Sequence, residues 1–189
     1  MQIKLSALSY DEIEMVRTWR NSPFVAQYMY RDDYISKEQQ EKWFEKVKAD
    51  PSCSYWIIEH NEEKLGLASV TSIDPVNKRC FWAFYLKSEE YAGSGIGAMV
   101  EYFVINHAFD KLLMNKICCE VFSFNEKVVL LHEKFGFRRE GLYRQHIFKN
   151  GQFEDVVAMG LLKEDWGHLK ERFDKMFKNK IFEYGVQGF

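Results

Sequence analysis

The stretch that decides the fold begins with Phe81-Trp82-Ala83-Phe84-Tyr85-Leu86 and resumes, after a short gap, with Tyr91-Ala92-Gly93-Ser94-Gly95-Ile96-Gly97-Ala98. The first part is an apolar run typical of a buried strand, and the second is a glycine-rich turn. A helical pattern follows from about Ile96 to Phe109. Glycines let the backbone approach a ligand, and the first amides of a helix are unpaired at the positive end of its dipole. The turn is therefore a candidate site for a phosphate or pyrophosphate.

The glycine pattern alone also fits a plain strand-to-helix turn that binds nothing. The phosphate loop of nucleoside triphosphatases needs Lys followed by Ser or Thr after its last glycine, whereas Ala98 and Met99 follow Gly97 here. A dinucleotide-binding fold needs its glycines near the start of a βαβ unit, with an acid about 20 residues later. Several expected strands precede this turn, and the acid at about that distance, Glu120, lies inside another expected strand. Both nucleotide motifs therefore fit poorly.

A second motif runs from Asn125 to Phe137 and reads Asn-Glu-Lys-Val-Val-Leu-Leu-His-Glu-Lys-Phe-Gly-Phe. Together the two motifs resemble the GCN5-related N-acetyltransferase (GNAT) superfamily. Its acetyl-CoA loop has the pattern Arg/Gln-x-x-Gly-x-Gly/Ala, and its later block is Asn-x-x-Ala-x-x-Leu-Tyr-x-Lys-x-Gly-Phe. The resemblance covers roughly residues 1 to 163. The chain departs from the pattern at Ala92, which replaces Arg or Gln, and at His132, which replaces Tyr.

The resemblance implies an α/β fold of the α+β type, the acyl-CoA N-acyltransferase fold. We expect a mixed, mostly antiparallel sheet of about seven strands with helices on both faces. One domain is expected over residues 1–178, followed by a tail over residues 179–189. Acetyl-CoA is the implied cosubstrate, and no metal is implied. The residues expected to contact acetyl-CoA are Tyr85, Leu86, Gly93, Ser94, Gly95, Ile96, Gly97, Ala98, Asn125 and Lys127.

The order of local patterns agrees with this fold. Capping boxes at Ser9-x-x-Glu12 and Ser36-x-x-Gln39 predict two early helices. Asn150-Gly151 is a strong hairpin signal between two long strand-like runs, 138–148 and 152–162. The other expected strands are 3–7, 55–60, 65–71, 79–86 and 117–122, and the other expected helices are 126–135 and 163–178.

The composition indicates one soluble, folded domain. The 189 residues can bury a substantial core, and 47% apolar content argues against disorder. The net charge of −2, with both signs interspersed, indicates neither a nucleic-acid nor a membrane partner. We see no signal-peptide pattern and no apolar run of about 18 residues. The cysteines lack zinc-type spacing, so we expect reduced thiols in a cytoplasmic protein. The four are Cys53, Cys80, Cys118 and Cys119.

The resemblance also suggests the catalytic residues. In ribosomal-protein acetyltransferases of the superfamily, a Glu in a Leu-Glu-Val strand is the base and a Tyr twelve residues later is the acid. Here Glu120 lies in Cys119-Glu120-Val121, and His132 follows twelve residues later. We therefore predict Glu120 as general base and His132 as general acid. The alternatives are a structural acid at Glu120 and a helix-surface histidine at His132.

The acceptor segment looks like that of the nucleotide-sugar N-acetyltransferases of pseudaminic acid biosynthesis, which acetylate the 4-amino group of a UDP-linked 4-amino-4,6-dideoxy sugar. Arg20 offers a rigid fork for a diphosphate. Gln40 stands where this resemblance leads us to expect histidine. The residues expected to bind the acceptor are Arg20, Asn21, Met29, Tyr30, Thr71, Trp82, Arg144 and His146.

Other functions stay open at this stage. A ribosomal-protein N-terminal amine or a polyamine are alternative acceptors, and a polyamine pocket needs several carboxylates. A different class is a non-catalytic acyl-CoA-binding domain, which would bind CoA without turnover. The last helix, with Trp166, Leu169 and Phe173 on one face, predicts either a homodimer contact or packing on its own domain.

Overall fold

The computed structural model describes residues 2–184, and of residues 181–184 the backbone alone. The strands are β1 (Ile3–Ala7), β2 (Ser54–His60), β3 (Glu63–Asp74), β4 (Arg79–Leu86), β5 (Lys116–Phe122), β6 (Arg138–Lys149), β7 (Gln152–Leu162) and β8 (Ile181–Tyr184). The helices are α1 (Ile13–Arg20), α2 (Pro23–Ala26), α3 (Lys37–Lys48), α4 (Ile96–Asn106), α5 (Glu126–Lys134) and α6 (Lys163–Phe177). Short helical segments are η1 (Tyr10–Glu12), η2 (Glu89–Tyr91) and η3 (His107–Lys111), the last of which is a π-helix that continues α4.

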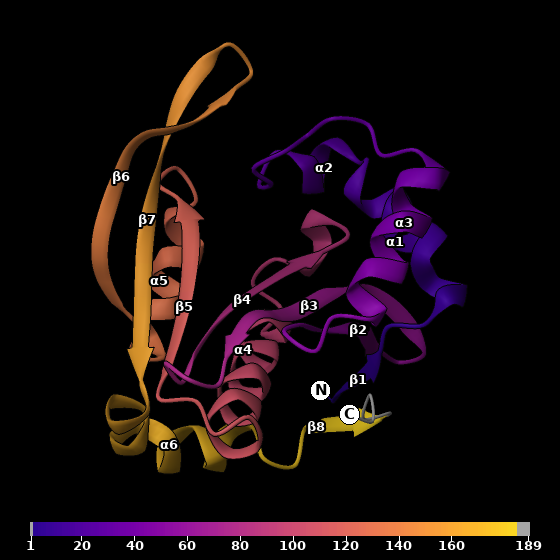
Figure 1. The fold of residues 1–189 in the computed structure, drawn as a ribbon. Helices are drawn as coiled ribbons and strands as arrows, with labels where there is room; N and C mark the ends of the chain where they lie inside the picture. The colour runs from indigo at the N-terminus through magenta and orange to yellow at the C-terminus, as the bar shows by residue number, and fades with distance from the viewer. Residues whose placement is uncertain (1, 185–189) are drawn as a thin grey trace.

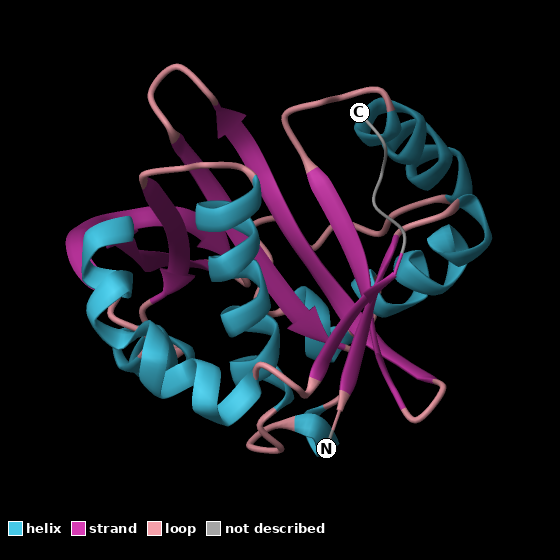
Figure 2. Ribbon diagram, turned by 90° about the horizontal axis from the view of Figure 1, so that it is seen from below, coloured by secondary structure: helices cyan, strands magenta, loops and turns pink. Residues whose placement is uncertain are grey.

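The strands form one mixed sheet in the order β6-β7-β5-β4-β3-β2-β1-β8, and Figure 2 shows helices on both sides of it. The expected fold class is confirmed. One boundary is wrong, because residues 181–184 pair in parallel with β1 and extend the sheet to an eighth strand. A four-residue edge strand with little apolar alternation gives too weak a pattern to predict. The rest of the expected tail, residues 185–189, lies outside the described residues.

Two central strands of the sheet run apart. β4 pairs with β5 in parallel only over Arg79–Phe81 and Lys116–Cys118. Beyond that point β4 stays paired with β3 up to Leu86, and β5 stays paired with β7 up to Phe122. The two strands therefore diverge in the middle of the sheet, as Figure 1 shows. Beyond this point each of the two strands is hydrogen-bonded to a neighbour along one edge, and its other edge faces the gap between β4 and β5.

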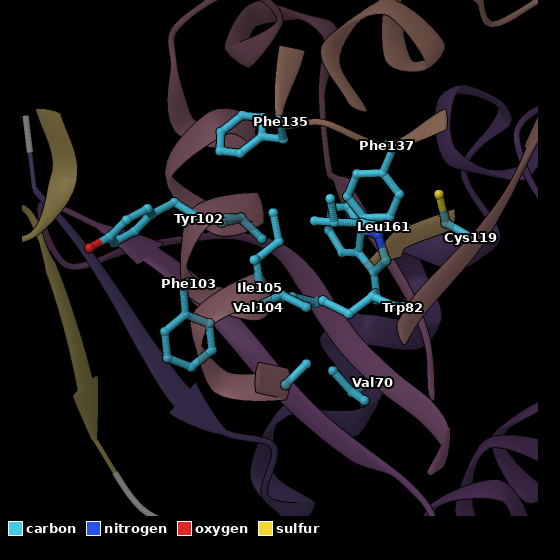
Figure 3. Close-up of a cluster of buried hydrophobic side chains, with 14 of the residues drawn as sticks. Val70, Trp82, Tyr102, Phe103, Val104, Ile105, Cys119, Phe135, Phe137 and Leu161 are labelled. Carbon is cyan, nitrogen blue, oxygen red and sulfur yellow. The ribbon is translucent and has the colours of Figure 1, made fainter. Parts of the chain in front are cut away.

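The larger core lies between the sheet and α4, α5 and α6. α4 is apolar nearly all round, which is typical of a helix enclosed by other elements. Figure 3 shows its side chains packed with Trp82 and Cys119 of the diverging strands and with Phe135 and Phe137. From α6, Trp166 and Phe173 join this core, so the last helix packs on its own domain. Each buried side chain of this size contributes about 1.5–3 kcal/mol.

The opposite face of the sheet carries α1 and α3 over a smaller core, and α2 lies against α1. Its buried members are Leu8, Ile13, Val16, Phe44, Ile57 and Leu67. Within residues 2–184 no helix has the length and apolar character needed to cross a membrane. The same range contains no cluster of His, Cys, Asp or Glu side chains able to hold a metal ion.

Candidate active site

The glycine turn folds as the sequence predicts. Gly93 and Gly95 have φ angles of +76° and +88°, a region that favours glycine. Gly95 caps the N-terminus of α4, and a side chain added at either glycine would meet open space. The hydroxyl of Ser94 donates to the carbonyl of Tyr91 at 2.6 Å and accepts from the amide of Ile96 at 3.3 Å. The turn therefore presents the open first turn of α4, which suits anionic groups.

The same helix is held close to β4. A Cβ added at Gly97 would lie 3.1 Å from the ring of Phe84, so glycine allows this close approach without a shift of the ring. Leu86 packs against the same larger core. The side chain of Tyr85, by contrast, packs on the smaller core under α1–α3, away from the glycine turn. We therefore correct the expectation for the Tyr85 side chain, because strand alternation turns it to the other face.

The remaining expected acetyl-CoA contacts lie at the start of α5. Asn125 is its N-cap residue, and the Asn125 carbonyl accepts from the amides of Val128 and Val129. Lys127 is exposed in the first turn. Together with Ile96 and Ala98 in the first turn of α4, these residues remain predicted contacts.

The register fixes the face on which Glu120 lies. Thr71 pairs with Phe81, and Phe81 pairs with Cys118, in the last row before β4 and β5 diverge. Neighbours across a sheet share a face, and so do residues two apart in a strand. Thr71, Cys118 and Glu120 therefore share the face covered by α1–α3. We call this the acceptor face, and the face under α4 and α5 the cofactor face.

Glu120 is bonded to a residue from the early acceptor segment. The hydroxyl of Tyr30 donates to Oε2 of Glu120 at 2.6 Å. Burial and this carboxylate both raise the pKa of Tyr30 above its ordinary value. The Tyr30 ring packs edge-on against Phe122 at 5.5 Å and against His146 at 6.1 Å between ring centroids. Three predicted site residues from distant parts of the chain, Tyr30, Glu120 and His146, thus meet in one place.

A buried lysine with no signal in the neighbouring sequence ties this segment to the late hairpin. Lys149, at the end of β6, is 5% exposed, and its Nζ donates to the carbonyls of Ala26 and Met29, each at 2.6 Å. The carboxylate of Asp32 lies 3.5 Å from the same Nζ. We call the two carbonyl contacts the Lys149 bridge. Met29 takes part in this bridge through its backbone, and the contact of its side chain with substrate stays a prediction.

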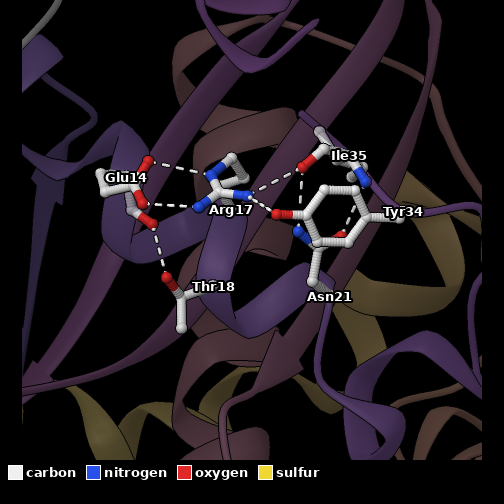
Figure 4. A network of polar contacts seen from close by, with 6 residues as sticks. All are labelled: Glu14, Arg17, Thr18, Asn21, Tyr34 and Ile35. Carbon is white, nitrogen blue, oxygen red and sulfur yellow. Dashed lines mark hydrogen bonds and ion pairs between the residues drawn. The ribbon is translucent and has the colours of Figure 1, made fainter. Parts of the chain in front are cut away.

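Asn21 makes a structural contact with the loop that follows α2, and its contact with substrate stays a prediction. Its side chain donates to the carbonyl of Ile35 at 3.0 Å and accepts from the amide of Ile35 at 2.8 Å. Arg17 donates to the same carbonyl at 2.9 Å and also bonds Glu14 and Tyr34 (Figure 4). Because both polar groups of the Asn21 amide are engaged, Asn21 closes the loop between α1 and α3.

Arg20 lies on the acceptor face next to Tyr85. Its Nη1 and the Tyr85 hydroxyl are buried, and neither has a hydrogen-bond partner among the described residues. Burial lowers the pKa of Arg20, partly opposed by Tyr85. Unpartnered buried donors are costly, so the pair is suited to a ligand with acceptor oxygens. Arg144, the other predicted arginine, is exposed on β6.

Two predicted site residues lie on the cofactor face. His132 is 3% exposed, and its Nδ1 lies 2.8 Å from Oε1 of Glu101, so the helix-surface alternative is wrong. Trp82 is also 3% exposed and packs on His132 and Phe84. The expected contact of Trp82 with the acceptor is therefore wrong, because its side chain lies in the larger core.

Comparisons with known proteins identify the family. A family model described as an acetyltransferase (GNAT) domain matches residues 2–138. Spermidine N(1)-acetyltransferase of Escherichia coli K12 is 25% identical over 164 residues, covering 87% of this chain and 88% of that protein. Acetyltransferase PseH of Campylobacter jejuni is 28% identical over 130 residues, covering 69% and 79%.

Solved structures support the fold. Spermidine N-acetyltransferase from Vibrio cholerae, in a crystal structure with CoA and spermine, has a TM-score of 0.82 at 23% identity, covering 87% of this chain and 98% of that one. A dodecameric structure of the same enzyme has a TM-score of 0.77 at 23% identity.

Proposed function

Because the chain belongs to the acetyltransferase (GNAT) domain family and is therefore an N-acetyltransferase, we propose that its acceptor is the 4-amino group of a nucleotide-linked amino sugar. The observation that carries the chemistry is Glu120, which lies on the acceptor face where β4 and β5 diverge and is held by Tyr30 at 2.6 Å. Bound acetyl-CoA would supply an acyl group activated as a thioester. The glycine turn is proposed to hold the anionic groups of this cosubstrate.

The chain supplies the proton transfers. A nucleophilic amine must be neutral and must lose a proton as the amide forms, and Glu120 can take that proton directly or through one water. Tyr30 occupies Oε2 and fixes the carboxylate, which leaves Oε1 for the amine. The unpaired edge of β4 offers backbone amides to the developing oxyanion. His132 supplies the proton for the thiolate from the cofactor face.

The charged side chains of the acceptor segment and of the late hairpin favour an anionic acceptor. Arg20 has an unpartnered buried donor, and Arg144 lies two residues before His146, which packs on Tyr30. Guanidinium groups match the geometry of a diphosphate. The acids of the same segment are already engaged: Asp32 lies near Lys149, and Asp33 pairs with Arg31 at 3.1 Å. The site therefore offers more unused positive than negative charge.

A polyamine is the second candidate, and the comparisons favour it over the nucleotide sugar. The spermidine acetyltransferases match 87% of the chain, whereas the PseH relative matches 69%. A polyamine acceptor would need the exposed acids Asp32, Asp33 and Glu120 to exchange their present partners for ammonium groups.

The test is acetyl-CoA turnover, followed as free thiol, with a UDP-4-amino-4,6-dideoxy sugar, spermidine and an N-terminal ribosomal peptide. We expect saturable turnover with the nucleotide sugar. Turnover with spermidine or the peptide alone would overturn the acceptor. Tight CoA binding without turnover would instead indicate a binding domain.

Two glutamine variants test the base. Glu120→Gln should lower kcat by about 10²–10⁴-fold, the usual contribution of a positioned base. Glu59→Gln is the matched control, because Glu59 lies in β2 and pairs with Lys4. Equal activity of the two variants would show that Glu120 is a structural acid.

A further inference from the structure

One ionisable residue lies inside the otherwise apolar helix α4. Glu101 has 0% exposure, and its Oε1 lies 2.8 Å from Nδ1 of His132. Its Oε2 is buried without a hydrogen-bond partner among the described residues. Burying a carboxylate is costly unless it is paired or neutral. The Glu101–His132 pair is therefore held by the fold at a cost that packing alone does not explain.

The surroundings of the pair fix how many protons it holds. Glu101 also acts on the thiol of Cys119 of β5, and burial raises the pKa of this thiol well above its ordinary value, so Cys119 is neutral. Burial likewise raises the pKa of Glu101, while His132 opposes that shift. Among the described residues, His132 is the titratable group that acts on Glu101, so the pair is least costly when its net charge is zero.

A neutral pair has two protons, whichever partner holds the shared one. Either Glu101 is protonated and donates to Nδ1, or Glu101 is ionised and accepts from Nδ1 of an imidazolium. In both arrangements Nε2 of His132 carries a proton. A third neutral arrangement, with the acid proton on Oε2 and Nδ1 donating to Oε1, would bury an O–H donor that has no partner among the described residues, which is costly. The pair therefore keeps His132 as a hydrogen-bond donor at Nε2, which is the state that a general acid needs.

We propose that Glu101 is a positioning residue that passes the shared proton to Nδ1 of His132 as the Nε2 proton leaves to the thiolate of CoA. This inference rests on the proposed acetyl transfer and deepens it. As the carbon–sulfur bond breaks, the electron pair stays on sulfur, which takes the Nε2 proton. Neutral His132 then keeps a proton on Nδ1, and Glu101 is ionised. Solvent returns one proton to the pair, and Glu120 releases to solvent the proton taken from the amine.

A neutral histidine needs this second proton donor to act as an acid, whereas tyrosine does not. A phenol gives up its proton to leave a phenolate, but a neutral imidazole that loses its single proton would become an imidazolate. A proton arriving at Nδ1 avoids that anion. Glu101 thus supplies the proton that His132 needs in the place where the family pattern has Tyr.

The variant Glu101→Gln distinguishes proton transfer to His132 from a purely structural role of Glu101. Glu101→Gln keeps the shape and a hydrogen bond to Nδ1 but has no proton to transfer. We expect kcat to fall as far as in His132→Gln, by about 10²-fold or more, with the KM for acetyl-CoA within about twofold, because Glu101 touches no substrate. The double variant should lose no more than either single variant, since the two residues act as a unit. Glu133→Gln, next to His132 but bonded to Arg139, is the matched control.

Nitrogen NMR of ¹⁵N-histidine protein gives a readout that does not depend on turnover. His132→Gln assigns the ring signals by their loss, and thermal unfolding shows that each variant is folded. The resting protein should show a protonated Nε2 at neutral pH and an Nδ1 shift that moves in Glu101→Gln. A pyridine-like Nε2 in the resting protein would overturn the proposal, whether or not an acceptor is found. So would a kcat for Glu101→Gln equal to that of Glu133→Gln while His132→Gln is impaired. If no acceptor is turned over, the proposed function is wrong. The NMR signal of Nε2 then still decides whether the Glu101–His132 pair holds two protons.

Discussion

Replacing Lys149 with methionine tests how the acceptor segment is held. The substitution keeps the apolar stem and removes the ammonium that donates to the carbonyls of Ala26 and Met29. A hydrogen bond from a charged donor contributes about 1.5 kcal/mol at the lower end of its range, which gives about 3 kcal/mol for the two. Removing the buried charge returns part of this, because its burial is costly. We expect a net loss of about 2 kcal/mol, or about thirtyfold in the opening equilibrium of the segment.

This loss is expected to be local. Hydrogen exchange of the amides of residues 26–32 should speed up about thirtyfold, whereas exchange in β2 and β3 should change little. Asp32→Asn is the matched control, because its carboxylate lies 3.5 Å from the same Nζ and is 41% exposed. An ion pair with one exposed partner contributes about 0.2–1 kcal/mol, so this control should change exchange by less than about fivefold. If Lys149→Met matches Asp32→Asn, or lowers protection evenly over the whole sheet, the Lys149 bridge does not hold the segment.

Single substitutions at Tyr30, Gly95 and His107 test three other features. Tyr30→Phe removes one hydrogen bond to Glu120, so kcat/KM for the acceptor should fall about fivefold, which is about 1 kcal/mol, while an unchanged KM for acetyl-CoA serves as control. Gly95→Ala puts a side chain on a residue with φ of +88°, so urea unfolding should show a loss of about 1 kcal/mol; no loss would mean that the turn relaxes. Burial lowers the pKa of His107 from 6.5 to about 4, so its contribution to stability is complete above pH 6.5 and is lost as the pH falls toward 4. The unfolding free energy of the native protein should therefore fall by up to about 3 kcal/mol more than that of His107→Gln over this pH range. Parallel curves of unfolding free energy against pH for the two proteins would contradict this prediction.

Local patterns predicted the parts of the fold that local chemistry determines. The glycine turn and the start of α4 at Ile96 follow from positive φ angles that favour glycine. Asn150 and Gly151 also have positive φ, +50° and +80°, as a type I′ hairpin requires. These features depend on two to six neighbouring residues, so they are visible without the rest of the chain.

Contacts between distant segments were not predictable in the same way. Nothing near Lys149 indicates that its partners lie about 120 residues earlier in the chain. The sequence indicates the burial of His132 only weakly, through its helical spacing from Val128 and Val129. The acid that pairs with the buried imidazole, Glu101, lies in another helix. Glu101 itself was visible as one charge in an apolar helix, and its meaning depends on a partner 31 residues away.

The alternation of β5 divides the proposed chemistry between the two faces of the sheet. Cys119 points to the cofactor face, where Glu101 acts on it, and Glu120, one residue later, points to the acceptor face. A thioester passing between the diverging strands would meet the base on one side and His132 on the other. The amine would then lose its proton where the acceptor binds, and sulfur would gain one where CoA binds. Because the two proton transfers are separated by the strand itself, the acid could change from Tyr to His, with its own companion in α4, without altering the acceptor face.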